Sequence, residues 1–154
     1  MKIAISADHR GHTSARSVAE RLTAQGHEVA TLGALDGKSC DYPELAFLVG
    51  NAIAAHKADR GILICGTGIG MSIAANKIAG VRAAVVHDEL TAQLSRSHND
   101  ANVLCLSADL LGQRLIDTIV DTFVNTEFEG GRHARRVHKI EAIEQGKDPA
   151  TIHD

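Results

Sequence analysis

The stretch that decides the fold is Gly61-Ile62-Leu63-Ile64-Cys65-Gly66-Thr67-Gly68-Ile69-Gly70. Its first half, residues 61–65, is apolar at every position after the glycine, which is typical of a strand buried on both faces in the middle of a parallel sheet. Its second half, residues 66–70, carries three glycines at alternate positions and predicts a tight turn into a helix. We therefore expect a central strand that ends in a glycine-rich loop.

Apolar runs of strand length alternate with helical patterns on both sides of this stretch. Further strands are predicted at residues 2–7, 28–32, 82–86 and 103–106. Helical spacing is found at residues 15–22, 45–52, 89–97, 111–123 and 137–143. Asp41 and Glu44 have the spacing of a capping box at the start of the second helix. Gly130-Gly131 is expected to break the chain before the last helix.

This alternation predicts an α/β fold, a Rossmann-like three-layer sandwich with a five-stranded parallel sheet. Helices are expected on both faces of the sheet, and the parallel strands are expected to be joined by right-handed crossovers. We expect one domain over residues 1–146 and an extended C-terminal tail over residues 147–154.

Composition excludes several classes of protein. The 154 residues are 44% hydrophobic and carry a formal net charge of −3, so no overall field favours nucleic acid or an anionic membrane. Aromatic residues make up 3%, with no Trp, which argues against single-stranded nucleic-acid binding. No apolar run approaches the roughly 20 residues of a membrane helix. The first residues lack the pattern of a signal peptide, so a cytoplasmic location is expected.

The three cysteines, Cys40, Cys65 and Cys105, lie far apart in the sequence. Their odd number and the expected reducing compartment favour free thiols over disulfides. C-x-x-C and H-x-x-x-H pairs are absent from the sequence, so no metal site is predicted.

Ligands of open parallel sheets bind beyond the carboxyl ends of the strands. Three predicted strands end there in polar or ionisable residues, namely Asp8-His9-Arg10-Gly11, the loop from Cys65 to Gly70, and His87-Asp88. The glycine loop does not fit a dinucleotide fingerprint, because the third glycine of G-x-G-x-x-G would fall at Met71. It also lacks the Lys-Ser/Thr pair of a P-loop.

Cys65 is the most informative residue of this edge. A buried cysteine is usually an inert small hydrophobic residue, and Cys105 is interpreted in that way. Cys65, however, ends a central strand and faces backbone N–H groups and a helix N-terminus. That setting favours the thiolate.

Two further segments carry candidate groups. His98, followed by Asn99, precedes the fifth strand and is either a solvated surface histidine or a proton donor and acceptor. Arg132 and Arg136 are four apart on a helix and share a face, so they form either a solvated basic surface or a clamp for a phosphate. We expect His98 and both arginines to lie near Cys65.

The sequence resembles a known family, ribose-5-phosphate isomerase B within the ribose/galactose-6-phosphate isomerases. The resemblance extends from Lys2 to about Gln145. The matching motifs are Ser6-Ala7-Asp8-His9, Asp41-Tyr42-Pro43, the stretch from Gly61 to Gly70, Ser72-Ile73-Ala74-Ala75-Asn76-Lys77, Ala92-Gln93-Leu94-Ser95-Arg96, His98-Asn99-Asp100, and Glu129-Gly130-Gly131-Arg132-His133.

The resemblance implies a role for each candidate residue. Cys65 matches the catalytic base, His98 the group that opens the sugar ring, and Thr67 a catalytic hydroxyl. The loop that stabilises the enediolate corresponds to Gly66, Thr67, Gly68, Ile69 and Gly70. Substrate contacts correspond to Asp8, His9 and Asn99, and the phosphate clamp to Arg132 and Arg136. Arg10 matches no role in the family.

The family implies interconversion of ribose 5-phosphate and ribulose 5-phosphate through a cis-enediol, with no cofactor. It also implies a homodimer, or a tetramer, in which each active site is shared between subunits. Three alternatives stay open: an isomerase of another sugar, such as allose 6-phosphate, erythrose 4-phosphate or a free rare sugar; a sugar-phosphate sensor without catalysis; and, from the glycine loop alone, a dinucleotide-dependent oxidoreductase.

Overall fold

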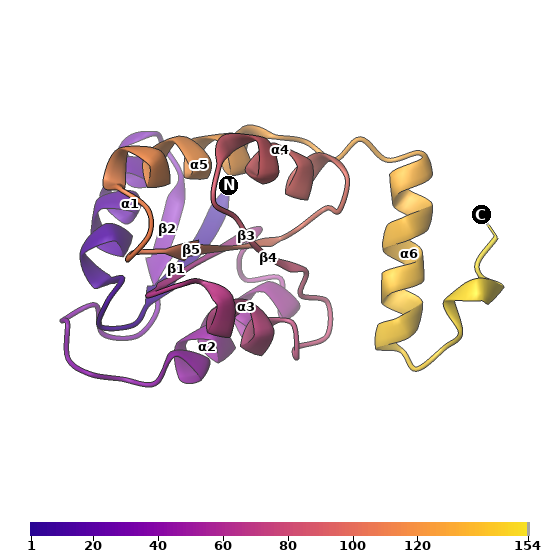
Figure 1. Cartoon of the computed structure of the whole chain (residues 1–154), viewed down its shortest axis with the longest axis horizontal. Helices are drawn as coiled ribbons and strands as arrows, with labels where there is room; N and C mark the ends of the chain where they lie inside the picture. The colour runs from indigo at the N-terminus through magenta and orange to yellow at the C-terminus, as the bar shows by residue number, and fades with distance from the viewer. Residues whose placement is uncertain (154) are drawn as a thin grey trace.

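Five parallel strands form one sheet at the centre of the computed structural model, which describes residues 1–153 (Figure 1). Their order across the sheet is β2-β1-β3-β5-β4. The strands are β1 (Lys2–Ala7), β2 (Glu28–Thr31), β3 (Arg60–Cys65), β4 (Ala83–Val85) and β5 (Val103–Ser107). Every neighbouring pair is parallel, which confirms the predicted α/β fold and its five-stranded parallel sheet.

Helices cover both faces of this sheet, so the three-layer arrangement is also confirmed (Figure 1). One face packs against α1 (His12–Ala24), α4 (Glu89–Ser97) and α5 (Gln113–Asn125). The other face packs against α2 (Tyr42–Ala54) and the short α3 (Ile69–Ala75). Within residues 1–153, no helix combines the length and apolar character needed to cross a membrane.

The central strand β3 is buried on both sides. Ile62 and Ile64 belong to the core beneath α1 and α5, whereas Leu63 and Cys65 belong to the core beneath α2 and α3. Because successive side chains of a strand point to opposite faces, an uninterrupted apolar run is what a strand between two helical layers requires. The hydrophobic character of residues 62–65 therefore follows from the position of β3 between β1 and β5.

Two local predictions differ from the structure. Asp41 is the N-cap residue of α2, but its side chain makes no capping hydrogen bond, so the predicted capping box is wrong. Pro43 stands at the second helical position and lacks the N–H that an N-cap side chain commonly bonds. The predicted strand at residues 82–86 is shorter, because β4 pairs with β5 at Ala83–Val85 only.

The C-terminal part begins where Gly130 and Gly131 adopt positive φ angles of 67° and 54°. The helix α6 (Arg132–Glu144) follows and projects from the body of the molecule (Figure 1). The tail was expected to be extended, but a 3-10 turn, η1 (Pro149–Thr151), folds back on α6 because the Asp148 side chain accepts a hydrogen bond from Ala150 N. The division into a domain of residues 1–146 and a tail of residues 147–154 stays a prediction.

A buried arginine holds the segment between α4 and β5. Arg96 is 1% exposed, and its Nη1 donates to Asp100 Oδ1 at 2.8 Å and to the carbonyl oxygen of Ala101 at 2.6 Å. Its Nε donates to the carbonyl oxygen of Thr126, and its guanidinium lies over the ring of Phe123. Burial of this cation is therefore compensated by hydrogen bonds and by a carboxylate.

We predict that Arg96→Ala lowers the free energy of unfolding by about 3 kcal/mol, because it leaves the carbonyl groups of Ala101 and Thr126 without their donor and Asp100 with Arg82 as its remaining ion-pair partner. Urea denaturation measures this change. The matched control is Arg21→Ala, which breaks the exposed ion pair with Asp121 and should lower the free energy of unfolding far less than Arg96→Ala does. Equal losses in the two variants would contradict the structural role of Arg96.

Candidate active site

The strand order marks one edge of the sheet as the ligand site. β2 lies on one side of β1 and β3 lies on the other, so the chain reverses its winding direction between β1 and β3. Open α/β sheets bind ligands beyond the carboxyl ends of the strands at such a switch point. The loops that meet there follow Ala7 and Cys65, and the end of β5 adjoins them because Ser107 pairs with Cys65.

Cys65 is the last residue of β3 and is 5% exposed. Its Sγ accepts a hydrogen bond from Gly68 N at 3.1 Å, so a backbone dipole points at the sulfur. Gly68 has a φ of 78°, and a Cβ at this position would lie 3.1 Å from the carbonyl carbon of Leu106. Only glycine combines this backbone conformation with so close an approach to β5. The turn therefore aims its N–H group at the thiol.

The loop is enclosed by groups from other elements. Tyr42, at the start of α2, lies against Gly70, where a Cβ would come within 2.6 Å of the tyrosine ring. Ser107 Oγ donates to the carbonyl oxygen of Gly66 at 2.6 Å. Thr67 is exposed, and its Oγ1 accepts from Ile69 N at 3.3 Å. The loop is thus held by Tyr42 and Ser107, and it carries the exposed hydroxyl of Thr67.

The loop after β1 lies beside the loop after β3. Asp8 N donates to the carbonyl oxygen of Ile64, which places Asp8 next to the end of β3. The Asp8 carboxylate is held by Arg10 N at 2.9 Å and by Gly11 N at 3.2 Å. His9 is exposed at the same turn. The structure therefore brings Asp8 and His9 together with Cys65, Thr67 and the three loop glycines.

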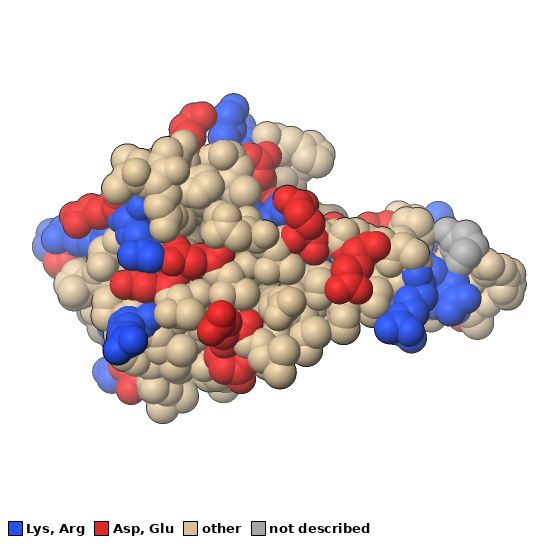
Figure 2. All heavy atoms as spheres, turned by 90° about the horizontal axis from the view of Figure 1, so that it is seen from above, with Lys and Arg blue, Asp and Glu red and all other residues tan. Residues whose placement is uncertain are grey.

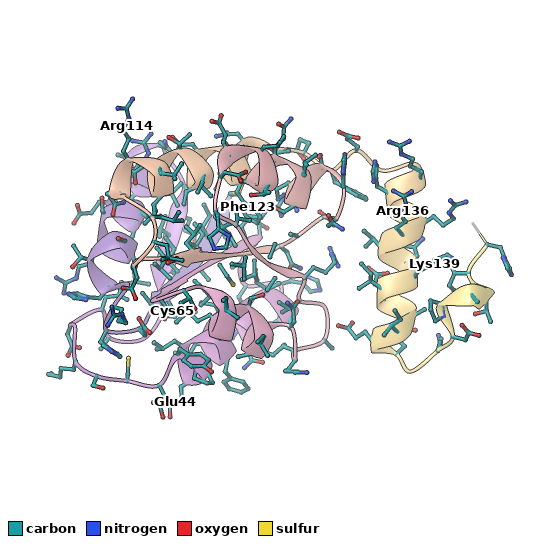
Figure 3. All side chains as sticks on the ribbon, in the orientation of Figure 1. Glu44, Cys65, Arg114, Phe123, Arg136 and Lys139 are labelled. Carbon is teal, nitrogen blue, oxygen red and sulfur yellow. The ribbon has the colours of Figure 1, made fainter. Side chains whose placement is uncertain are left out.

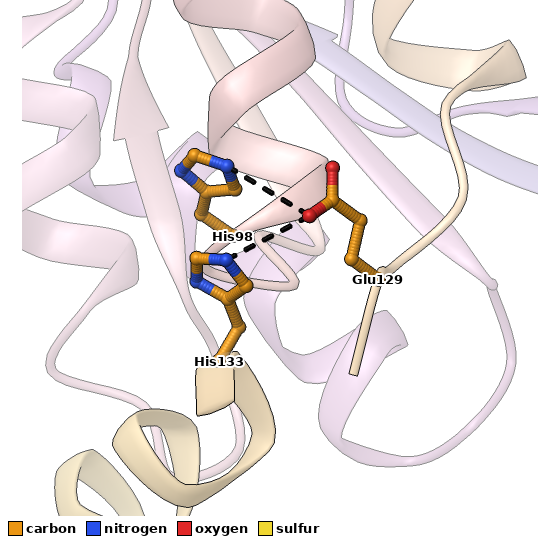
Figure 4. Close-up of side chains that lie close together, drawn as sticks. All are labelled: His98, Glu129 and His133. Carbon is orange, nitrogen blue, oxygen red and sulfur yellow. Dashed lines mark ion pairs between the residues drawn. The ribbon is translucent and has the colours of Figure 1, made fainter. Parts of the chain in front are cut away.

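A second cluster is built from the end of α4 and the start of α6. The rings of His98 and His133 are stacked, with 4.1 Å between their centroids and 6° between their planes. Oε2 of Glu129 lies 3.7 Å from Nε2 of His133 and 4.0 Å from Nε2 of His98 (Figure 4). Arg132 Nε donates to Nε2 of His133 at 3.4 Å. Arg136 belongs to the same cluster, because its charge acts on His133.

Within one chain the two clusters do not meet. Cys65 pairs with Ser107 at the carboxyl end of β5, whereas His98 precedes Val103 at its amino end. A strand of that length spans about 13 Å at a rise of about 3.3 Å per residue. Figure 3 shows Cys65 in the body and Arg136 on the projecting helix α6. The expectation that His98, Arg132 and Arg136 lie near Cys65 is therefore wrong for a single chain.

Asn99 is part of neither the Cys65 loop nor the His98–Glu129–His133 cluster. It is exposed, and it lines a cavity of about 460 Å³ between α6 and the β4 edge of the sheet, together with Arg82 and Ile140. The cavity lies beside the second cluster, at the end of α4 that carries His98. Asn99 therefore accompanies His98 and lies away from Cys65.

The ligand atoms of His98, Glu129 and His133 lie within 4.8 Å of one another, close enough to share one metal ion. However, Nε2 of His133 already accepts from the Arg132 guanidinium, and Arg136 adds a second positive charge. Figure 2 shows Lys and Arg side chains on the projecting end of the molecule. This electrostatic environment favours an anion over a divalent cation.

Several residues of these sites received no functional role from sequence reasoning. Tyr42 and Ser107 reach the Cys65 loop through contacts between elements far apart in the chain, and neither residue type is distinctive. Glu129 and His133 did carry a signal, because both belong to the motif Glu129-Gly130-Gly131-Arg132-His133 that carries the family resemblance. The stack of His133 on His98 joins two segments that no local pattern connects.

The geometry defines a class of protein: an open parallel α/β fold with a buried thiol at its switch point and a histidine–arginine cluster at the opposite edge. Residues 3–140 match the Ribose/Galactose Isomerase family, and the chain belongs to that family.

Known proteins similar to this chain carry matching names. It is 46% identical to ribose-5-phosphate isomerase B of Escherichia coli, over 96% of this chain and 99% of that protein. The Clostridium thermocellum ribose-5-phosphate isomerase B structure superimposes with a TM-score of 0.93 at 48% identity, covering 95% and 99% of the two chains. The structure of ribose-5-phosphate isomerase B from Mycoplasma genitalium, with bound ribulose-5-phosphate, superimposes with a TM-score of 0.90 at 44% identity. The match covers 94% of this chain and 96% of that chain.

Burial lowers the pKa of His133, and the neighbouring charges of His98 and Arg132 lower it further. The folded state therefore favours the neutral ring, whereas an unfolded histidine titrates near about 6.5. We predict that stability falls as the pH drops from about 7 to about 5, because the unfolded chain then binds more protons. In His133→Gln this loss should shrink, as measured by the thermal midpoint against pH. His87→Gln, at an exposed histidine, is the control, and its thermal midpoint should depend on pH as that of the wild type does. The same pH dependence in His133→Gln as in the wild type would contradict the prediction.

Proposed function

We propose that this chain interconverts ribose 5-phosphate and ribulose 5-phosphate through a cis-enediol. The observation that carries the proposal is the Cys65 thiol, which ends β3 at the switch point and accepts a hydrogen bond from Gly68 N. Membership of the Ribose/Galactose Isomerase family supports it, as does the ribulose-5-phosphate bound by the Mycoplasma genitalium relative.

The proposed chemistry is proton transfer between neighbouring carbons. The Cys65 thiolate takes the proton from C2 of the aldose and returns it to C1, the hydroxyl proton passes from O2 to O1, and negative charge accumulates on the enediolate oxygen between these transfers. The N–H from Gly68 stabilises the thiolate, and the other N–H groups of residues 66–70, apart from that of Ile69, which donates to Thr67 Oγ1, are the donors for the oxyanion. Thr67, Asp8 and His9 contact the substrate hydroxyls. Because the proton is moved and returned, the reaction needs no cofactor.

The second half of the site is proposed to come from another subunit. His98 opens the sugar ring, Asn99 contacts the substrate, and Arg132 and Arg136 bind its phosphate, yet all four lie away from Cys65 in the same chain. A homodimer that sets the His98 cluster of one subunit against the Cys65 loop of the other assembles one complete site.

The surface beside the Cys65 loop supports this arrangement. Ile69 and Ile73, on α3, are 53% and 59% exposed and four residues apart, so they form one apolar face next to the loop. Neighbouring exposed apolar side chains of this kind are typical of a protein interface. A cytoplasmic location is part of the proposal, supported by three free cysteines and by the metabolic relatives.

We predict that Cys65→Ala and Cys65→Ser each lower kcat by about 10²–10⁴-fold, because the base is lost, while KM changes little. Steady-state assays with ribose 5-phosphate measure the loss. Cys40→Ala is the matched control, at a partly exposed thiol outside the site, and should keep wild-type activity.

Three outcomes would contradict the proposal. A Cys65→Ala enzyme with the wild-type rate removes the assignment of the base. Binding of the sugar phosphate by the wild type without proton exchange at C2 in deuterated water indicates a sensor. Faster turnover of allose 6-phosphate or erythrose 4-phosphate than of ribose 5-phosphate assigns a different substrate.

Sharing of the site between subunits predicts complementation. Cys65→Ala and His98→Ala are each inactive as homodimers, but a refolded equal mixture contains heterodimers that carry one intact site. The mixture should recover about a quarter of the wild-type activity, since half of the dimers are mixed and half of their sites are intact. Assays before and after joint refolding measure this recovery, and a mixture that stays inactive places the whole site in one chain.

A further inference from the structure

Arg10 and Asp109 form an ion pair across the carboxyl edge of the sheet. Arg10 follows β1 and Asp109 follows β5, and β3 lies between these strands. Arg10 Nε donates to Asp109 Oδ2 at 2.8 Å and to Oδ1 at 3.0 Å, while its Nη2 lies 2.8 Å from Oδ1. The pair therefore crosses over the end of β3, where Cys65 stands.

The ion pair lies directly on the glycine loop. A Cβ on Gly66 would come within 2.9 Å of Asp109 Oδ2 and within 3.2 Å of Arg10 Nε. The Gly66 carbonyl oxygen is held from the other side by Ser107 Oγ and by Asp109 N. Arg10 is thus fixed against the residue that follows the proposed catalytic base.

The guanidinium keeps one hydrogen-bonding edge free. Asp109 occupies the edge formed by Nε and Nη2, and within residues 1–153 no group accepts from Nη1. The Arg10 side chain is 55% exposed, so the edge formed by Nη1 and Nη2 is open to solvent. Asp109 also raises the pKa of Arg10, which keeps the group charged.

The charges around the loop indicate what this edge binds. Asp8 and Asp109 both lie at the rim of the Cys65 loop, so an approaching dianion meets negative charge there. Arg10 is the cation that contacts this loop, and a planar pair of N–H donors matches two oxygens of a phosphate.

We propose that Arg10 binds the phosphate group of the substrate, with Asp109 holding the guanidinium in place. This inference rests on the proposed function, because it assumes a phosphorylated substrate beside Cys65. It adds to the phosphate clamp a third arginine, one that comes from the Cys65 edge of the sheet and that the family pattern does not supply.

Arg10→Ala tests the inference. KM for ribose 5-phosphate should rise at least about tenfold, as should the inhibition constant of inorganic phosphate, because one charged hydrogen-bonding partner is lost. The value of kcat should stay within about threefold, since Arg10 touches no reacting carbon. Arg10→Lys keeps the positive charge but lacks the planar pair of N–H donors, so it should raise both constants less than Arg10→Ala does.

Arg21→Ala is the matched control, since it also breaks an exposed ion pair between distant segments, and it should leave both constants unchanged. Unchanged constants in Arg10→Ala overturn the inference, and so does a loss confined to kcat. Arg10→Gln, which retains a neutral donor for Asp109, repeats the test if the alanine variant is unstable. If the wild type does not isomerise ribose 5-phosphate, the proposed function fails, and calorimetric titration with inorganic phosphate still decides the role of Arg10.

Discussion

Parallel pairing of β3 with β1 on one side and β5 on the other is the constraint on which the rest of the structure depends. It buries the strand beneath helices on both faces, so residues 62–65 must be apolar or small. It also brings the ends of three strands to one edge, where the backbone of Cys65 and Gly66 is fixed by Ala108 N and Asp109 N. A loop anchored on both sides can hold an N–H group against a sulfur without relying on its own short sequence.

Close contacts then determine which residues can form that loop. Gly68 passes the backbone of Leu106 at a distance that excludes a side chain, and Gly70 passes the ring of Tyr42. The loop is therefore rigid because its neighbours fill the space that side chains would occupy. Such rigidity suits a site that must hold donors in place before charge develops, since no reorganisation is then needed during the reaction.

Local patterns were sufficient to predict most of the fold. Strand and helix periods depend on nearby residues, so the five strands, the helical layers and the loop after Cys65 could be predicted from the sequence. The strand order could not be predicted, because it depends on long-range packing. For the same reason the sequence did not indicate at which edge of the sheet His98 lies. The missing cap at Asp41 reflects Pro43 two residues later, a local effect that the spacing rule ignores. The contact of Arg10 with Asp109 joins positions 99 apart, beyond the reach of any periodic pattern.

The Arg10–Asp109 pair also has an evolutionary consequence. Loss of the arginine leaves an unpaired carboxylate above Gly66, and loss of the aspartate releases a guanidinium over the same loop. Neither single change preserves the electrostatic balance at the rim, so the two positions are electrostatically coupled. Among family members, the residue types at these positions should covary even though they belong to different strand–loop units. The charge at this edge is therefore a property of the pair and of neither residue alone.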